Sequence, residues 1–258
     1  KRGFAAEMTQ SQVLAIGIYR SKSPFRRLCI AQLKQLCHEA HVTEQNFSAM
    51  RAAMVASQLR TNNVNDPRVI AAIEGVARER FVSAERRALA YVDVPVPLGG
   101  GRALNAPMAT ARLLTEAKLS PVDKLLIIGA ATGYAAAVAA ELVGSVTAVE
   151  EDDILFAQGH ANLAGSTRVV LVHGPLAAGW EGAAPYDVII VDGAVEQVDP
   201  RIIAQLSDGG RLLTGLDDGA VTRLAAGRKA GDFCTLIAFA DVETVRLPGF
   251  ETAKGFAF

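Results

Sequence analysis

The chain has 258 residues, of which 50% are hydrophobic and 21% are charged, and its formal net charge is -1. A chain of this length and apolar content buries a sizeable core, and it lacks the charge excess that nucleic-acid-binding proteins usually carry as a basic face. Its longest apolar stretches fall short of the roughly 20 residues that span a bilayer. We therefore expect a globular protein that binds neither nucleic acid nor membrane.

Cysteine and histidine spacing argues against a metal site. The three cysteines, Cys29, Cys37 and Cys234, form no C-x-x-C pair and no zinc-ligand pattern, and His160 and His173 add no further ligand spacing. The odd number of cysteines also argues against a disulfide framework. We expect a reducing, cytoplasmic location and no metal.

Residues 1 to 42 differ from the rest of the chain. They contain two of the three cysteines, two of the four histidines, and a basic cluster at Arg20, Lys22, Arg26 and Arg27. This segment is either an accessory helical extension or material outside the functional domain, and the sequence leaves both interpretations open.

Two helices and a long loop are predicted next. Phe47, Met50, Met54 and Leu59 recur at near-helical spacing, and a second helix begins at Pro67, where proline is favoured as the first helical residue. The segment from Pro95 to Pro107 is rich in proline and glycine and leads into a third helix. A loop of this length within a compact domain is usually functional or disordered.

From residue 121 onward, strand-like and helix-like segments alternate. This pattern predicts parallel strands joined by right-handed crossovers, which is a doubly wound α/β sheet. Ligands in such sheets bind beyond the carboxyl ends of the strands. The predicted strands are Lys124 to Ile128, Ser145 to Val149, Arg168 to Val172, Asp187 to Val191 and Arg211 to Thr214, and the predicted helices are Tyr134 to Val143, Asp153 to Ala164 and Pro200 to Leu206.

The loop after the first of these strands, "GAATG", indicates the type of ligand. A dinucleotide fingerprint, G-x-G-x-x-G, would place glycines at Ala131 and Tyr134, so it fails at both positions. The shorter G-x-G-x-G loop of S-adenosylmethionine enzymes is matched at Gly129 and Gly133. Glu150 follows about twenty residues later at a strand end, where a carboxylate can accept hydrogen bonds from ribose hydroxyls. Alternatively, the glycines only form a tight turn and Glu150 is a solvated strand terminus.

Longer motifs resemble the protein-L-isoaspartate O-methyltransferases, which use S-adenosylmethionine to methylate the abnormal carboxyl group of damaged aspartyl residues. The resemblance begins near Met50 and is carried by "MVASQLRTNNVNDPRVIAAIEGVARERFV", "ALAYVDVPVPLGGG" and "GWEGAAPYDVIIVDGAVEQVDPRIIAQLSDGGRLL". It implies a Rossmann-like methyltransferase fold with a helical N-terminal cap. Residues 43 to 120 then form the cap and active-site loop, and residues 121 to 258 form the core with C-terminal strands.

The chain departs from the family pattern at three positions. Asn105 stands where the family has the active-site serine, and Ile127 and Pro175 stand where it has carboxylates that face the cofactor. A hydrogen bond to a charged group contributes about 1.5–3 kcal/mol, so two lost carboxylates would weaken cofactor binding by roughly 3–6 kcal/mol. Glu150 remains as the main carboxylate of the expected site.

The resemblance implies S-adenosylmethionine as cofactor and a damaged protein or peptide carrying isoaspartate as partner. Asn105 and Asp192 are the expected catalytic residues, although Asp192 and the nearby Glu196 also suit a turn and a helix start. We expect weak or retargeted methyl transfer to a protein carboxylate. The alternative is a catalytically silent relative that binds a ligand or a protein through the same cleft. The expected cofactor-binding residues are Gly129, Ala131, Gly133, Tyr134 and Glu150.

Overall fold

A computed structural model describes residues 47–252 of the chain. The predicted extension, residues 1 to 42, therefore lies outside the described residues. Residues 50–252 belong to one compact unit, which holds all the predicted site residues. Within the described part, no helix is long and apolar enough to cross a membrane.

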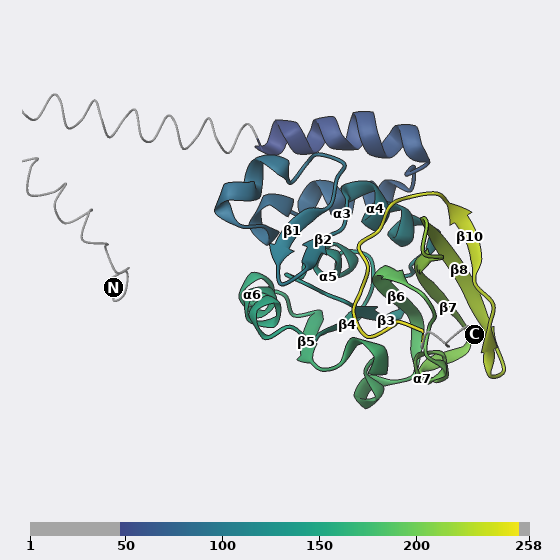
Figure 1. The fold of residues 1–258 in the computed structure, drawn as a ribbon. Helices are drawn as coiled ribbons and strands as arrows, with labels where there is room; N and C mark the ends of the chain where they lie inside the picture. The colour runs from purple at the N-terminus through teal and green to yellow at the C-terminus, as the bar shows by residue number, and fades with distance from the viewer. Residues whose placement is uncertain (1–46, 253–258) are drawn as a thin grey trace, which may run out of the picture. The chain divides into compact units, whose positions relative to one another are not determined.

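The first part of this unit is helical, as predicted for a helical cap (Figure 1). Residues 50–54 are helical, and α3 (Pro67–Gly75) begins as expected at Pro67, with the Asp66 side chain accepting a hydrogen bond from the Arg68 N–H. That bond satisfies one of the unpaired N–H groups of the first helical turn. The other segments of the cap are η1 (Val55–Leu59), η2 (Arg60–Asn62), η3 (Arg78–Phe81) and η4 (Ala84–Leu89).

The long loop predicted from Pro95 to Pro107 contains a β-hairpin that the sequence analysis missed. Strand β1 (Val96–Gly99) pairs antiparallel with β2 (Arg102–Leu104), and helix α4 (Pro107–Glu116) follows. The cross-strand pair Val96 and Leu104 is buried, so the hairpin has an apolar base that short-range sequence patterns did not show. The two strands form a separate small sheet.

The main sheet has the predicted doubly wound topology, with strand order β10-β8-β7-β6-β3-β4-β5. Strands β7, β6, β3, β4 and β5 are parallel, and β8 and β10 add antiparallel pairs at one edge. The strands are β3 (Lys124–Ile128), β4 (Ser145–Glu150), β5 (Val169–His173), β6 (Tyr186–Val195), β7 (Leu206–Asp217), β8 (Thr222–Ala230), β9 (Phe233–Cys234) and β10 (Ile237–Ala240), and the connecting helical segments are α5 (Tyr134–Ala139), α6 (Asp153–Leu163), η5 (Leu176–Ala178), η6 (Glu181–Ala183) and α7 (Pro200–Ala204).

Strand pairing changes several predicted boundaries. Strands β6 and β7 run well beyond their predicted ends, because they pair with each other from Tyr186 and Leu206 to Val195 and Leu216. Helix α7 consequently ends at Ala204 and not at Leu206. Long-range pairing of this kind overrides local propensity at the ends of elements.

Strand β3 lies at the centre of the five parallel strands, and Leu125, Leu126, Ile127 and Ile128 are completely buried. The chain passes from β3 to β4 and β5 on one side and then returns to β6 and β7 on the other. The strand order therefore reverses next to β3, and the carboxyl ends of β3, β4 and β6 form the edge where a ligand is expected.

Candidate active site

The loop after β3 is held by contacts on two sides. The N–H groups of Gly129 and Ala130 donate to the Val149 carbonyl at 3.0 and 2.9 Å, which ties the loop to β4. Gly129 has φ +83°, and a Cβ added there would lie 2.9 Å from the Leu247 side chain. A glycine is thus required where the C-terminal segment of the fold packs against the loop.

Ala131 occupies the position where the shorter loop pattern has its central glycine. Its φ is +49°, in the left-handed region that disfavours residues with a Cβ. Its N–H donates to Glu150 Oε2 at 2.7 Å. The loop therefore keeps the conformation of a glycine turn even though alanine replaces the glycine.

Ala131→Gly should stabilise the protein by about 0.5–1 kcal/mol, because the relief of left-handed strain exceeds the added chain entropy of glycine. The matched control is Ala130→Gly, at a neighbouring buried alanine without positive φ, which should destabilise by about 0.5–1 kcal/mol. Urea unfolding of both variants measures the difference. Destabilisation by both substitutions to the same extent would show that Ala131 carries no strain.

Glu150 ends β4 and is completely buried. Besides the bond from Ala131, its Oε1 accepts the N–H groups of Glu151 and Asp152, each at 3.1 Å. Glu150 lies at the carboxyl edge of the sheet, as the sequence predicted, and these three backbone donors, which it did not predict, hold its carboxylate there. Its surroundings rule out the alternative of a solvated strand terminus.

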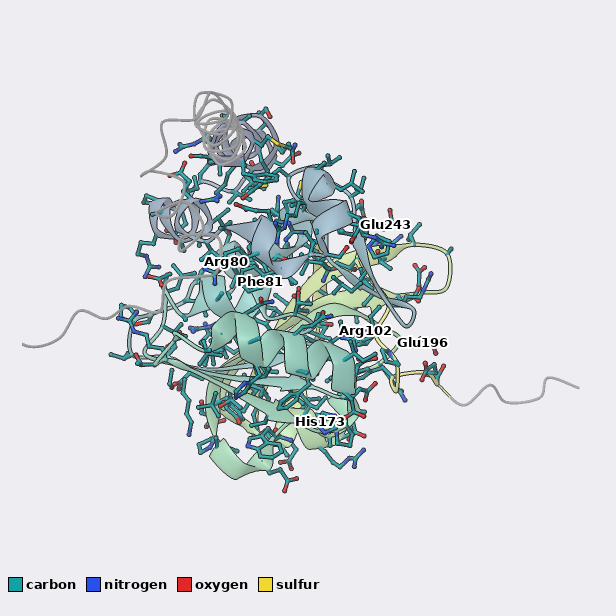
Figure 2. All side chains as sticks on the ribbon, turned by 90° about the vertical axis from the view of Figure 1, so that its left-hand side faces the viewer. Arg80, Phe81, Arg102, His173, Glu196 and Glu243 are labelled. Carbon is teal, nitrogen blue, oxygen red and sulfur yellow. The ribbon has the colours of Figure 1, made fainter. Side chains whose placement is uncertain are left out.

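Arg102 of β2 forms a buried ion pair with Glu150 (its position is labelled in Figure 2). Its two terminal nitrogens donate one to each carboxylate oxygen, Nη1 to Oε1 at 2.6 Å and Nη2 to Oε2 at 2.9 Å. Arg102 is 6% exposed and Glu150 is 0% exposed. A carboxylate offers about four acceptor positions, and five N–H donors already point at this one.

The predicted catalytic residues Asn105 and Asp192 lie together. The Asn105 amide donates to the main-chain carbonyl and to Oδ1 of Asp192, both at 2.9 Å. Its side-chain oxygen accepts the Val245 N–H at 2.8 Å. Asn105 thus connects the loop after the hairpin to β6 and to the C-terminal segment.

Burial raises the pKa of the Asp192 carboxyl, because the charged form loses solvation. The Asn105 hydrogen bond and the nearby cations Arg78 and Arg102 act in the opposite direction but do not outweigh burial. The charge of Arg102 therefore influences Asp192 as well as Glu150, which places both acidic groups in one electrostatic site.

Arg78 and Tyr134 lie on the cap side of this site. Arg78 is completely buried, donates to the Ala90 and Asn105 carbonyls, and its guanidinium carbon lies 4.6 Å from the centre of the Tyr134 ring. Phe81 packs edge-on against the same ring. The Tyr134 ring, which was predicted to contact the cofactor, is thus enclosed by cap residues, and burial raises its pKa.

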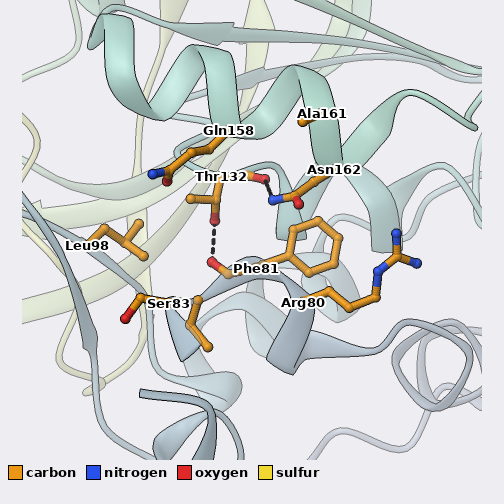
Figure 3. Close-up of a pocket in the computed structure, with 9 residues that line it drawn as sticks. Arg80, Phe81, Ser83, Leu98, Thr132, Gln158, Ala161 and Asn162 are labelled. Carbon is orange, nitrogen blue, oxygen red and sulfur yellow. Dashed lines mark hydrogen bonds between the residues drawn. The ribbon is translucent and has the colours of Figure 1, made fainter. Parts of the chain in front are cut away.

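A pocket of about 270 Å³ is lined by residues of η3, β1 and α6 and by Thr132 of the loop (Figure 3). The Thr132 hydroxyl donates to the Phe81 carbonyl at 2.7 Å, and the Asn162 amide donates to the Thr132 carbonyl at 2.9 Å. Leu98 of β1 also lines the pocket. None of the predicted catalytic or cofactor-binding residues lines it.

Other residues singled out in the sequence lie elsewhere. Ile127 is buried within β3, and Pro175 directly precedes η5. Glu196 accepts hydrogen bonds from Thr252, and His173 lies 3.1 Å from Asp153 on the exposed side of β5. Among residues 47–252, no group of three or more His, Cys, Asp or Glu side chains is arranged to hold a metal ion.

Two arginines of the site were not predicted. Arg78 lies in "RERFV", within a motif that carries the family resemblance, and Arg102 directly follows the three glycines of "VPLGGG". Sequence spacing does not show that either arginine is buried. The one available signal was a cation next to a glycine-rich turn.

The model of the protein-L-isoaspartate(D-aspartate) O-methyltransferase family matches residues 50–246, which include the whole site. Protein-L-isoaspartate O-methyltransferase 1 of Rhodopseudomonas palustris is 37% identical over 210 residues, 80% of this chain and 86% of the relative. The protein-L-isoaspartate O-methyltransferase of Herpetosiphon aurantiacus is 35% identical over 205 residues, 79% of this chain and 92% of the relative.

Solved structures agree with the observed fold. A protein-L-isoaspartate O-methyltransferase superimposes with a TM-score of 0.65 at 23% identity, covering 71% of this chain and 62% of that one. A second structure, from Plasmodium falciparum and described as a putative member of the same family in complex with S-adenosyl-L-homocysteine, gives a TM-score of 0.63 at 15% identity over 78% of this chain and 98% of that one.

Proposed function

The chain belongs to the protein-L-isoaspartate O-methyltransferase family, and from this premise we propose that it transfers a methyl group from S-adenosylmethionine to the carboxyl group of isoaspartyl residues in damaged proteins. The family match includes the loop after β3, Glu150, Asn105 and Asp192. We further propose the cytoplasm as its location, on the basis of the three cysteines without disulfide or metal spacing.

The geometry of Glu150 is the observation that carries the proposal. Its two oxygens accept two parallel donors from a single group, the Arg102 guanidinium, at 2.6 and 2.9 Å. The adjacent hydroxyls of a ribose present the same pattern of two neighbouring donors. The residues present therefore fit the cofactor, with Glu150 as the ribose acceptor beside the loop from Gly129 to Gly133.

Asn105 and Asp192 are proposed to position the substrate carboxylate. S-adenosylmethionine supplies the electrophilic methyl group, and a carboxylate accepts it with little need for acid or base catalysis. The contribution of this chain is then orientation and exclusion of water. Both side chains are buried at the carboxyl edge of β6, which suits that role.

One observation favours the second candidate, a catalytically silent relative. Donors from this chain already fill every acceptor position of the Glu150 carboxylate. The Asn105 side chain likewise makes three hydrogen bonds within the chain. A relative that has lost its cofactor would show such internal bonding.

Methyl transfer to a peptide separates the two candidates. With labelled S-adenosylmethionine, we expect label on an isoaspartyl peptide and none on the matched peptide that carries normal aspartate. Absence of label from both peptides, with the protein folded, would contradict the enzymatic proposal and favour the silent relative.

A further inference from the structure

From the Arg102–Glu150 pair we infer that Arg102 is a gate for the cofactor: it occupies the ribose position of the site, and S-adenosylmethionine binds only when Arg102 has left Glu150. The inference rests on the proposed function, because it assigns Glu150 to the ribose. It adds that one side chain, Arg102, controls whether the cofactor can bind.

Competition follows from the number of acceptor positions. Three backbone N–H groups and two guanidinium N–H groups already point at the Glu150 carboxylate. Since a carboxylate has about four acceptor positions, two ribose hydroxyls have no room beside Arg102. The backbone donors come from the loop and from the start of α6, so the guanidinium is the group that must leave.

The Glu150 carboxylate keeps hydrogen-bond donors when the ribose hydroxyls replace Arg102. When Arg102 leaves, the carboxylate keeps the N–H donors of Ala131, Glu151 and Asp152 and is not left as an unsolvated charge. The two positions that become free are those facing the former guanidinium.

The hairpin that carries Arg102 can move without disrupting the core. Its base is buried through Val96 and Leu104, whereas its tip, Gly99 to Gly101, is exposed and all three glycines have positive φ. Glycine adopts this conformation and others at little cost, so the tip can rearrange locally. Arg102 is the first residue after the tip.

Once it has left Glu150, the Arg102 guanidinium lies close to acidic side chains at the N-terminus of α6. A Cβ added at Gly100 would lie 3.4 Å from Asp152 Oδ2, so the hairpin tip lies against the N-terminus of α6. Glu151, Asp152 and Asp153 form an acidic run there, and none of the three is buried. Arg102 thus exchanges a buried partner for solvent next to carboxylates.

Calorimetric titration with S-adenosylhomocysteine tests the gate in wild type and in Arg102→Gln. Arg102 is paired with Glu150 in most molecules of the free protein, and only molecules without this pair bind the ligand. The apparent Kd is the intrinsic Kd divided by the fraction of such molecules, so removal of the pair should tighten binding by roughly tenfold or more. The matched control is Arg211→Gln, which removes an arginine paired with Asp123 near the opposite ends of the strands and should leave the Kd unchanged.

Arg102→Lys provides the test if the glutamine variant does not fold. Lysine keeps the charge but cannot make two parallel N–H bonds, so binding should be tighter than in wild type by a smaller factor. In Arg102→Ala, added methylguanidinium should compete with S-adenosylhomocysteine, whereas in wild type it should have no effect. A purely structural arginine would not produce this competition.

If wild type binds S-adenosylhomocysteine and Arg102→Gln binds it with the same or lower affinity, the gate is overturned and the proposed function is left intact. No binding in wild type or in any Arg102 variant would overturn both. Tighter binding in Arg102→Gln together with unchanged binding in Arg211→Gln supports the gate, whatever the rate of methyl transfer.

Discussion

Glu150→Ala should weaken S-adenosylhomocysteine binding at least tenfold and lower the free energy of unfolding by about 3–5 kcal/mol. Affinity falls because the charged acceptor of the ribose hydroxyls is lost. Stability falls because the N–H groups of Ala131, Glu151 and Asp152 lose their acceptor, and because Arg102, which is 6% exposed, loses its partner and must move toward solvent. Calorimetric titration and urea unfolding measure the two effects separately.

A double variant separates these effects of Glu150. Arg102→Ala combined with Glu150→Ala removes both charges, so it should be less destabilised than Glu150→Ala alone. Its affinity should nevertheless stay low, because the acceptor is still absent. An unchanged Kd in Glu150→Ala would remove Glu150 from the cofactor site.

Asn105→Asp should lower the free energy of unfolding by about 3 kcal/mol or more at neutral pH and abolish methyl transfer. The substitution keeps the shape of the side chain and the acceptor for the Val245 N–H. It replaces the amide donor, which lies 2.9 Å from Asp192 Oδ1, with a second buried carboxylate. Two adjacent buried anions repel each other without solvent to screen them.

The pH dependence identifies this cause. Burial already raises the pKa of Asp192 in the folded protein, and a neighbouring carboxylate raises it further. The folded state then binds more protons than the unfolded state above the ordinary pKa of 3.8, so the stability of the variant falls as pH rises. The deficit relative to wild type should therefore narrow as the pH is lowered toward about 4.

Asn105→Ser is the informative comparison, because it restores the hydroxyl that the family resemblance places there. Serine is too short to replace all three bonds of Asn105, so we expect a loss of about 1–3 kcal/mol in stability. We expect faster methylation of the isoaspartyl peptide. A rate no faster than that of wild type would show that Asn105 does not limit the reaction.

The sequence predicted the elements that depend on local pattern. Strand β3 was predicted with its observed ends, and the start of α3 at Pro67 followed from its cap. The hairpin was missed because its stability comes from burial of Val96 and Leu104 within a stretch rich in turn-forming residues. The ends of β6 and β7 were missed because pairing between distant strands determines them.

The same distinction applies to the site. Spacing placed Glu150 beside the loop, and the structure shows the Ala131 N–H bonded to its carboxylate. Arg102 is 48 residues away from Glu150 in sequence, and only the fold brings the two together. The resemblance to the family identified Asn105 but did not indicate that it links Asp192 to Val245.

Titration of wild-type protein with S-adenosylhomocysteine tests the central claim most directly, because it needs no assumption about the substrate. We expect saturable binding with a Kd in the micromolar range, which corresponds to a binding free energy of roughly -8 kcal/mol. No heat of binding and no thermal shift at millimolar ligand would contradict it and would identify the chain as a silent member of its family.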